Sequence, residues 1–288
     1  MSADGGSGGG AAHGEPTPQI VSLPGGGNAP ALGMGSWQLA EGRHPIEQEK
    51  EALQTGLSLG MTLIDTAEMY GSGASEEMVG TVIAGQREKV FLVSKVLPTN
   101  ATRAEDIRSA CAGSLKRLKT DFLDLYLLHW RGGVRQLDVV VDAFESLKEE
   151  GKIRRWGVSN FGVADMEELF GIDGGGGCAT NQVDYSLTTR GIEADLIPWS
   201  VREGVPIMAY SPLGTGSGHI LDNPVLAEVA DRHGVTPAAV AIAWTMRNGE
   251  TISIPESGTL EHIREDAAAL GLKLSEEDLA DLDRAFPA

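Results

Sequence analysis

Short apolar runs alternate along the chain with longer stretches in which apolar residues recur every three or four positions. The runs are typical of strands buried on both faces, and they span residues 32–36, 62–65, 90–95, 123–128, 153–158, 179–183, 206–210 and 251–254. The stretches between them predict amphipathic helices, for example over residues 48–59, 75–84, 103–119, 137–150 and 224–233. The repeating unit is therefore a strand followed by a helix.

The number of these units predicts the fold. Glycine follows several predicted helices, at Gly60, Gly85, Gly151 and Gly234, where a helix commonly ends on a left-handed residue. A doubly wound sheet is the alternative, but the third glycine of its dinucleotide signature is missing after 33–38 (Gly-Met-Gly-Ser-Trp-Gln). Eight strand–helix units instead match an α/β fold of the TIM-barrel type, (β/α)8. We predict one such barrel domain over residues 19–288.

Residues 1–18 differ in composition from the rest of the chain. They contain six glycines together with Ser, Ala and Pro and show no hydrophobic periodicity. Such a composition cannot bury enough apolar surface to offset the entropy lost on ordering. We expect a disordered, glycine-rich arm.

Charge and cysteine content narrow the classes of partner. The formal net charge is −18, which repels phosphate backbones and anionic lipids, so neither nucleic acid nor a membrane surface is expected as a partner. The two cysteines, Cys111 and Cys178, show no metal-binding or disulfide spacing, and no run approaches the length of a membrane span. We expect a cytoplasmic monomer that acts on a small molecule.

The ends of the predicted strands carry the candidate chemistry, because barrel enzymes place their active sites there. These positions are unusually polar: Ser36, Trp37, Asp65, Lys95, His129, Ser159, Asn160, Gln182, Tyr210, Ser211, Glu256 and Ser257. Tyr70 follows Asp65 by five residues, close enough for its loop to return the phenol over the barrel mouth.

Asp65, Tyr70, Lys95 and His129 form a chemically consistent set. A phenol that titrates near 10 needs a nearby cation to favour its phenolate, and Lys95 can supply that charge while Asp65 holds the ammonium. His129 can donate a hydrogen bond to a carbonyl oxygen as a hydride arrives at carbon. Since no side chain delivers a hydride, this scheme requires a nicotinamide cofactor. Ser159, Asn160 and Gln182 can bond its carboxamide, and Tyr210 can stack on its ring.

Five motifs occur in order along the chain: Leu63-Ile64-Asp65-Thr66-Ala67-Glu68-Met69-Tyr70-Gly71, Leu125-Tyr126-Leu127-Leu128-His129-Trp130, Gly157-Val158-Ser159-Asn160-Phe161, Asn181-Gln182-Val183 and Ala209-Tyr210-Ser211-Pro212-Leu213. Through these motifs the chain resembles the aldo-keto reductase superfamily over about residues 20–286. In overall sequence it is most similar to bacterial reductases of small aldehydes and dicarbonyls such as methylglyoxal. The resemblance implies NAD(P)H-dependent reduction of aldehydes or ketones, with Tyr70 as general acid supported by Asp65, Lys95 and His129.

The resemblance also implies binding residues for cofactor and substrate. The implied cofactor set comprises Gly35, Ser36, Trp37, Asp65, Ser159, Asn160, Gln182, Tyr210, Ser211, Leu213, Ser217, Glu256, Ser257, Thr259, His262 and Asp266. The implied substrate pocket comprises Trp37, Met69, Tyr70, His129 and Trp130. The chain ends at Ala288, where many relatives continue into a loop that closes over the substrate, so we expect an open pocket.

The segment after the last strand departs from the family pattern. Relatives that bind NADPH usually carry Lys, Arg and Asn there, whereas this chain has Glu256, His262 and Asp266. Because a 2′-phosphate favours cations, we predict that NADH serves at least as well as NADPH. Arg264 remains an alternative cation that can restore NADPH binding.

Two other functions remain open at this stage. A barrel of this kind can serve as a cofactor-sensing or binding subunit with weak catalysis, which steady cofactor oxidation with an aldehyde would distinguish. A barrel metallohydrolase requires clustered His and Asp ligands, and the strand ends supply only His129 and Asp65. We therefore expect no metal.

Overall fold

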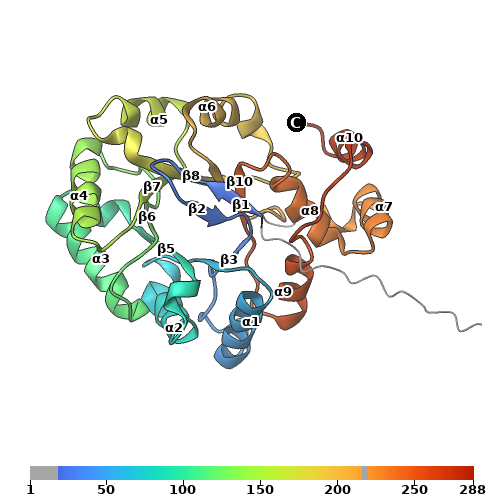
Figure 1. Cartoon of the computed structure of the whole chain (residues 1–288), viewed down its shortest axis with the longest axis horizontal. Coiled ribbons are helices and arrows are strands. Elements are labelled where there is room, and N and C mark those ends of the chain that lie inside the picture. Colours follow the sequence, from blue (N-terminus) through green and yellow to red (C-terminus); the bar gives the residue numbers. More distant parts are fainter. Residues whose placement is uncertain (1–18, 216–219) are drawn as a thin grey trace, which may run out of the picture.

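The computed structural model describes residues 19–215 and 220–288, and its centre is a barrel of parallel strands in sequence order (Figure 1). The strands are β3 (Gly33–Gly35), β4 (Leu63–Asp65), β5 (Phe91–Val96), β6 (Leu125–Leu128), β7 (Trp156–Ser159), β8 (Cys178–Asp184), β9 (Ile207–Tyr210) and β10 (Thr251–Ile254). Single bridges from Leu32 to Ser253 and from Gly35 to Glu256 close the ring between β3 and β10. The predicted (β/α)8 single-domain fold is confirmed. The predicted arm over residues 1–18 and the candidate Ser217 lie outside the described residues.

Helices surround the barrel on its outside (Figure 1). They are α1 (Ile46–Ser58), α2 (Ala74–Val82), α3 (Ala104–Leu118), α4 (Leu137–Glu149), α5 (Val163–Phe170), α6 (Leu196–Glu203), α7 (Pro224–His233), α8 (Pro237–Thr245), α9 (Leu260–Ala267) and α10 (Glu276–Ala285). Gly60, Gly85, Gly151 and Gly234 have φ values of 103°, 76°, 71° and 64°. The predicted left-handed helix ends are therefore present.

A two-stranded antiparallel hairpin, β1 (Ile20–Ser22) and β2 (Asn28–Pro30), precedes the barrel and was not predicted. Each strand has three residues and buries one, Val21 or Ala29, which is too short for a periodic signal. The hairpin lies over the barrel in Figure 1, and Arg155, just before β7, donates to the Gly26 carbonyl. It therefore covers the end where the strands begin and leaves the opposite end for the site.

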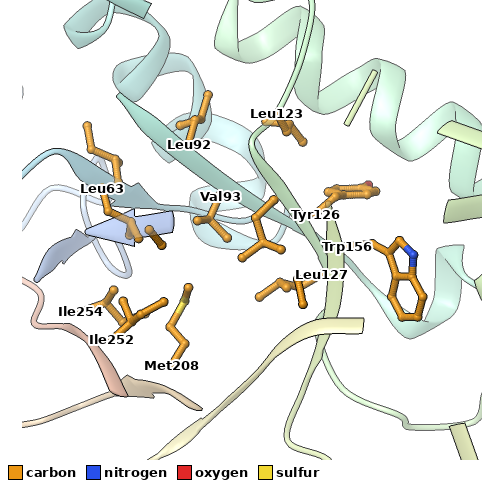
Figure 2. Packing of buried hydrophobic residues seen from close by; sticks show 14 of the residues in the cluster. Leu63, Leu92, Val93, Leu123, Tyr126, Leu127, Trp156, Met208, Ile252 and Ile254 are labelled. Atoms are coloured by element: carbon orange, nitrogen blue, oxygen red, sulfur yellow. The ribbon is translucent and has the colours of Figure 1, made fainter. Parts of the chain in front are cut away.

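The core has two layers, one inside the barrel and one between strands and helices. Figure 2 shows Val93 of β5, Leu127 of β6 and Met208 of β9 among the buried side chains. Tyr126 and Trp156 instead pack on Phe144 of α4, with ring centroids 5.6 and 5.8 Å apart. The alternation of inward and outward side chains places every second strand residue in the interior. At the carboxyl ends of the strands, these interior positions are polar.

Within the described ranges, no helix is long and apolar enough to cross a membrane. Cys111 and Cys178 are both buried and free. Burial raises the pKa of each thiol to about 12, so neither is a reactive thiolate.

Candidate active site

Lys95 lies at the centre of the candidate site, at the end of β5, with its side chain fully buried. Its Nζ donates to Asp65 Oδ2 at 2.6 Å, to the Thr66 carbonyl at 2.9 Å and to the Tyr70 hydroxyl at 3.2 Å. Asp65 ends the neighbouring strand β4, and Tyr70 comes from the loop that follows it. A buried ammonium is stable only when its hydrogens are bonded and its charge is paired, and these contacts meet both conditions.

His129 follows β6 and lies beside the phenol. Its ring meets the Tyr70 ring edge to face, with centroids 5.7 Å apart. Burial, followed by the charge of Lys95, lowers the pKa of His129 to about 3, so the imidazole is neutral at physiological pH. Its Nδ1 is buried and has no hydrogen-bond partner among the described residues. A neutral imidazole keeps one N–H, which can bond a substrate oxygen.

The pKa of Tyr70 is raised above its ordinary value. Burial is the main cause and the charge of Asp65 adds to it, whereas Lys95 acts in the opposite direction. Lys95 thus lowers the pKa of Tyr70, as predicted, but burial in the barrel mouth raises that pKa by more. The phenol is consequently protonated at neutral pH, which is the state that a proton donor requires.

The loop that carries Tyr70 is held by contacts that the sequence did not suggest. Glu68 Oε1 accepts hydrogen bonds from Leu97 N at 2.8 Å and Asn100 Nδ2 at 3.0 Å. After Tyr70, residues 71–73 (Gly-Ser-Gly) all have φ between 54° and 96°, a region that the two glycines adopt without strain. These glycines were the only sequence signal for the turn; the partners of Glu68 depend on tertiary contacts.

A cavity of about 420 Å³ opens at the carboxyl ends of the strands, where the barrel fold predicts a site. Predicted residues that line it are Gly35, Trp37, Asp65, Met69, Tyr70, His129, Trp130, Ser159, Asn160, Gln182, Tyr210, Ser211, Leu213 and Glu256. Lining residues that the sequence analysis missed are Pro212, Gly214, Thr215, Ile254 and Pro255. The missed residues lie beside or near predicted ones, at the end of β10 and in the loops after β9 and β10, so proximity in the chain was the available signal.

The wall of this cavity fits a nicotinamide ring with its carboxamide. Asn160 Nδ2 donates to the His129 carbonyl at 3.2 Å, and Asn160 Oδ1 accepts from the Tyr210 hydroxyl at 2.9 Å. Ser159 Oγ donates to the Gln182 carbonyl at 2.8 Å. Side-chain amides and hydroxyls therefore lie next to a half-buried aromatic ring on neighbouring strands. Polar groups for an amide and an aromatic face for a ring are what a nicotinamide needs.

Several predicted cofactor residues do not line the cavity. Ser36 is buried, and its Oγ accepts a hydrogen bond from Ser75 at 2.8 Å. Ser257 Oγ donates to the Thr259 carbonyl at 3.3 Å, and Thr259 caps α9 by accepting from His262 N. His262 is exposed in the first turn of α9. Ser257 and Thr259 thus build the turn before α9, and Ser36 ties the end of β3 to α2, so none of them forms the cavity wall.

Asp266 is buried on α9, although its residue type alone suggests a solvated anion. Desolvation raises its pKa to about 8, so burial favours the neutral carboxyl at pH 7. This position weakens any repulsion between Asp266 and a 2′-phosphate.

Glu256 is the acidic residue of this segment that lines the cavity. Its Oε2 accepts from Arg43 Nη1 at 3.1 Å, while its Oε1 is buried and has no partner within the described part of the chain. Burial raises the pKa of Glu256, and Arg43 acts against this by favouring the carboxylate. An unpartnered buried acceptor on a cavity wall indicates a place for a hydrogen-bond donor.

Comparisons with known proteins agree with this geometry. The Aldo/keto reductase family model matches residues 31–286. Methylglyoxal reductase YeaE of Escherichia coli is 47% identical over 273 residues, covering 94% of this chain and 95% of that protein. Glyoxal reductase of Bacillus subtilis is 35% identical, with 91% of each chain covered. The crystal structure of an aldo/keto reductase from Klebsiella pneumoniae in complex with NADP and acetate is 44% identical, with a TM-score of 0.89 and coverage of 94% and 96%.

The family match covers most of the chain, and the resemblance drawn from the five motifs is confirmed. The reductase interpretation is supported over the cofactor-sensing alternative. The chain belongs to the aldo/keto reductase family and is an oxidoreductase that acts on carbonyl groups with NAD(P)H.

Proposed function

We propose that this enzyme reduces small aldehydes and dicarbonyl compounds, with Tyr70 as the proton donor. The observation that carries the assignment is the buried contact of Lys95 Nζ with Tyr70 and Asp65 at 3.2 and 2.6 Å. Proton donation leaves a phenolate, and a charged ammonium within hydrogen-bond distance stabilises that product.

The bound cofactor and the side chains of the cavity have separate roles in the reaction. When bound, the reduced nicotinamide supplies a hydride to the carbonyl carbon. His129, neutral at physiological pH, donates a hydrogen bond to the carbonyl oxygen and orients it. Tyr70 transfers its proton to the same oxygen, giving the alcohol, and Lys95 holds the resulting phenolate until solvent reprotonates it. Asp65 Oδ2 accepts a hydrogen bond from the Lys95 ammonium at 2.6 Å and keeps it in place.

The substrate class follows from the size and walls of the cavity. Trp37, Met69 and Trp130 form its apolar edge, and the open space is about 420 Å³. This favours compact carbonyl compounds, as do the names of the methylglyoxal and glyoxal reductases that the chain resembles. The test is cofactor consumption with methylglyoxal, glyoxal, simple aldehydes, aldoses and ring ketones, compared as kcat/KM. A higher kcat/KM for aldoses or ring ketones than for methylglyoxal would contradict this substrate class.

NADH is proposed to serve at least as well as NADPH. Support comes from Glu256, which lines the cavity and has a buried oxygen free to accept a bond from an unphosphorylated ribose. A 2′-phosphate would meet this carboxylate instead, at a cost in free energy. The two Klebsiella pneumoniae structures contain NADP and NADPH, so a preference for NADH distinguishes this chain from that relative.

The cofactor proposal is tested by kcat/KM for both cofactors with one aldehyde. An NADPH preference above about tenfold, which is about 1.4 kcal/mol, would overturn it. The double substitution Glu256→Lys with His262→Arg should move the preference toward NADPH by about tenfold or more, because it places two permanent cations where the chain has a carboxyl and an imidazole.

Cell location and assembly remain proposals from the sequence. We propose a cytoplasmic monomer with a small carbonyl compound as its partner and no nucleic acid, supported by free buried cysteines and the net charge of −18. Sedimentation of the purified chain at micromolar concentration tests the monomer.

A further inference from the structure

The loop between β3 and α1 reaches across the seam where the barrel closes. Arg43 of this loop donates from Nη1 to Glu256 Oε2 at 3.1 Å and to Gln38 Oε1 at 2.5 Å. Its neighbour His44 packs against the turn before α9, since a Cβ added to Gly258 would lie 2.9 Å from His44 Cδ2. A cation from the loop after the first barrel strand thus lies beside Glu256, a cavity residue that follows the last barrel strand.

Arg43 contacts a residue of the cavity wall, whereas the basic residues of α9 do not. Like Arg43, His262 and Arg264 are exposed and lie outside the cavity lining, but among the described residues neither side chain forms a hydrogen bond or ion pair with Glu256. Around Glu256, the charged or titratable groups are Arg43, His44 and two buried carboxyls, Glu49 and Asp266. Among these, only Arg43 carries a permanent positive charge.

The guanidinium also has capacity for a second anion. Both of its contacts use Nη1, so Nε and Nη2 have no partner in the described ranges. The side chain of Arg43 is 45% exposed, against 19% for Glu256. An exposed arginine with unused donors can rotate toward an incoming phosphate and bind it through two parallel hydrogen bonds.

We propose that Arg43 is the specificity-determining residue for the 2′ position of the cofactor, pairing with Glu256 when the ribose is unphosphorylated and binding the phosphate when NADPH enters. This rests on the proposed placement of the ribose at Glu256. With NADH, Glu256 stays paired through Oε2 and accepts the ribose hydroxyl through Oε1. With NADPH, the phosphate competes with Glu256 for Arg43, so binding requires the ion pair to open.

The test is cofactor binding in the absence of substrate, followed by quenching of tryptophan fluorescence, for which Trp37 and Trp130 on the cavity wall are reporters. Arg43→Met should raise the Kd of NADPH by about tenfold or more and that of NADH by less than about threefold. Arg43→Lys should lie between Arg43→Met and the wild type, because a lysine keeps the charge without the paired donors. Arg264→Met is the matched control and should change neither Kd.

A second measurement isolates the ribose end from the nicotinamide. Adenosine 2′,5′-bisphosphate should compete with NADPH less well in Arg43→Met than in the wild type, whereas competition by AMP should not change. Glu256→Gln should tighten NADPH binding in the wild-type background, because it frees Arg43, and should do so much less in the Arg43→Met background.

Three results would overturn the proposal: equal effects of Arg43→Met on both cofactors, no effect on either, or a loss of NADPH affinity in Arg264→Met instead. These results are separate from failure of the cofactor proposal, which depends on the wild-type preference alone. A wild type that prefers NADPH strongly, yet loses that preference on Arg43→Met, would refute the NADH proposal and support the role of Arg43.

Discussion

Gln182 donates from Nε2 to Asp65 Oδ1 at 2.8 Å across the interior of the barrel. The two residues lie on β8 and β4, which are four strands apart in an eight-stranded ring and therefore face each other. Asp65 Oδ2 accepts from Lys95, so both carboxylate oxygens are bonded. Asp65 thereby connects the proposed cofactor wall with the proposed proton donor and fixes the position of Lys95.

Replacing Tyr70 by Phe should lower kcat by about 100-fold or more, because general acid catalysis is typically worth that much. The Kd of the cofactor should stay within about threefold, since the hydroxyl serves proton transfer. Tyr126→Phe is the control: this buried phenol packs on α4 away from the cavity and should leave kcat unchanged. Retention of more than about half of the wild-type kcat in Tyr70→Phe, with hydride transfer shown to limit the rate, would exclude the assignment.

Breaking the buried Lys95–Asp65 pair should destabilise the fold. Lys95→Met leaves the carboxylate of Asp65 buried without its cation and should lower the free energy of unfolding by about 3–5 kcal/mol. The double variant Lys95→Met with Asp65→Asn should recover part of this loss, because no unpaired charge remains. Urea unfolding curves of the wild type and the two variants measure these free energies; a loss below about 1 kcal/mol in Lys95→Met would contradict the account.

His129 should make the protein less stable as the pH falls. Its pKa is about 3 when folded and about 6.5 when unfolded, so between these values the unfolded chain binds the extra proton. Stability from this group is complete above about pH 6.5 and is lost as the pH falls toward the folded pKa. Asp266, with a pKa raised to about 8, acts in the opposite direction.

The contribution of His129 is measured by comparison with His129→Gln, which leaves the other groups in place. The difference in unfolding free energy between wild type and variant should fall by about 2 kcal/mol from about pH 7 to pH 5. A difference that stays constant over this range would show that His129 titrates normally in the folded protein.

Glu68 should act as a positioning residue for Tyr70 through its contacts with Leu97 and Asn100. Glu68→Ala removes the acceptor at 2.8 and 3.0 Å and should lower kcat by about threefold to tenfold while cofactor Kd is unchanged. Glu68→Gln keeps an acceptor oxygen and should restore most of the activity. Equal losses in both variants would indicate that the charge matters rather than the hydrogen bonds.

The fold and the clustering of the proposed catalytic residues were predictable because local signals specify them. Each strand is a short apolar run with a polar residue at or just after its end: Asp65 ends β4, Lys95 lies one residue before the end of β5, and His129 follows β6. In a parallel barrel all strand ends of one kind meet at one face, so residues far apart in sequence are brought together by the topology alone. That rule also correctly placed Gln182, Asn160 and Tyr210 around the cavity.

Tertiary structure decided what depends on burial and on contacts between distant loops. The sequence determined that Asp266 and Glu256 are acidic, but only the packing of α9 makes Asp266 neutral by withdrawing it from water. Likewise, nothing in the sequence pairs Arg43 with Glu256, because they are 213 positions apart and meet only where β3 closes against β10. Strand periodicity is a local property of the chain, whereas solvation and charge pairing are properties of the folded molecule, so the sequence determined the barrel and the fold set the electrostatics of its mouth.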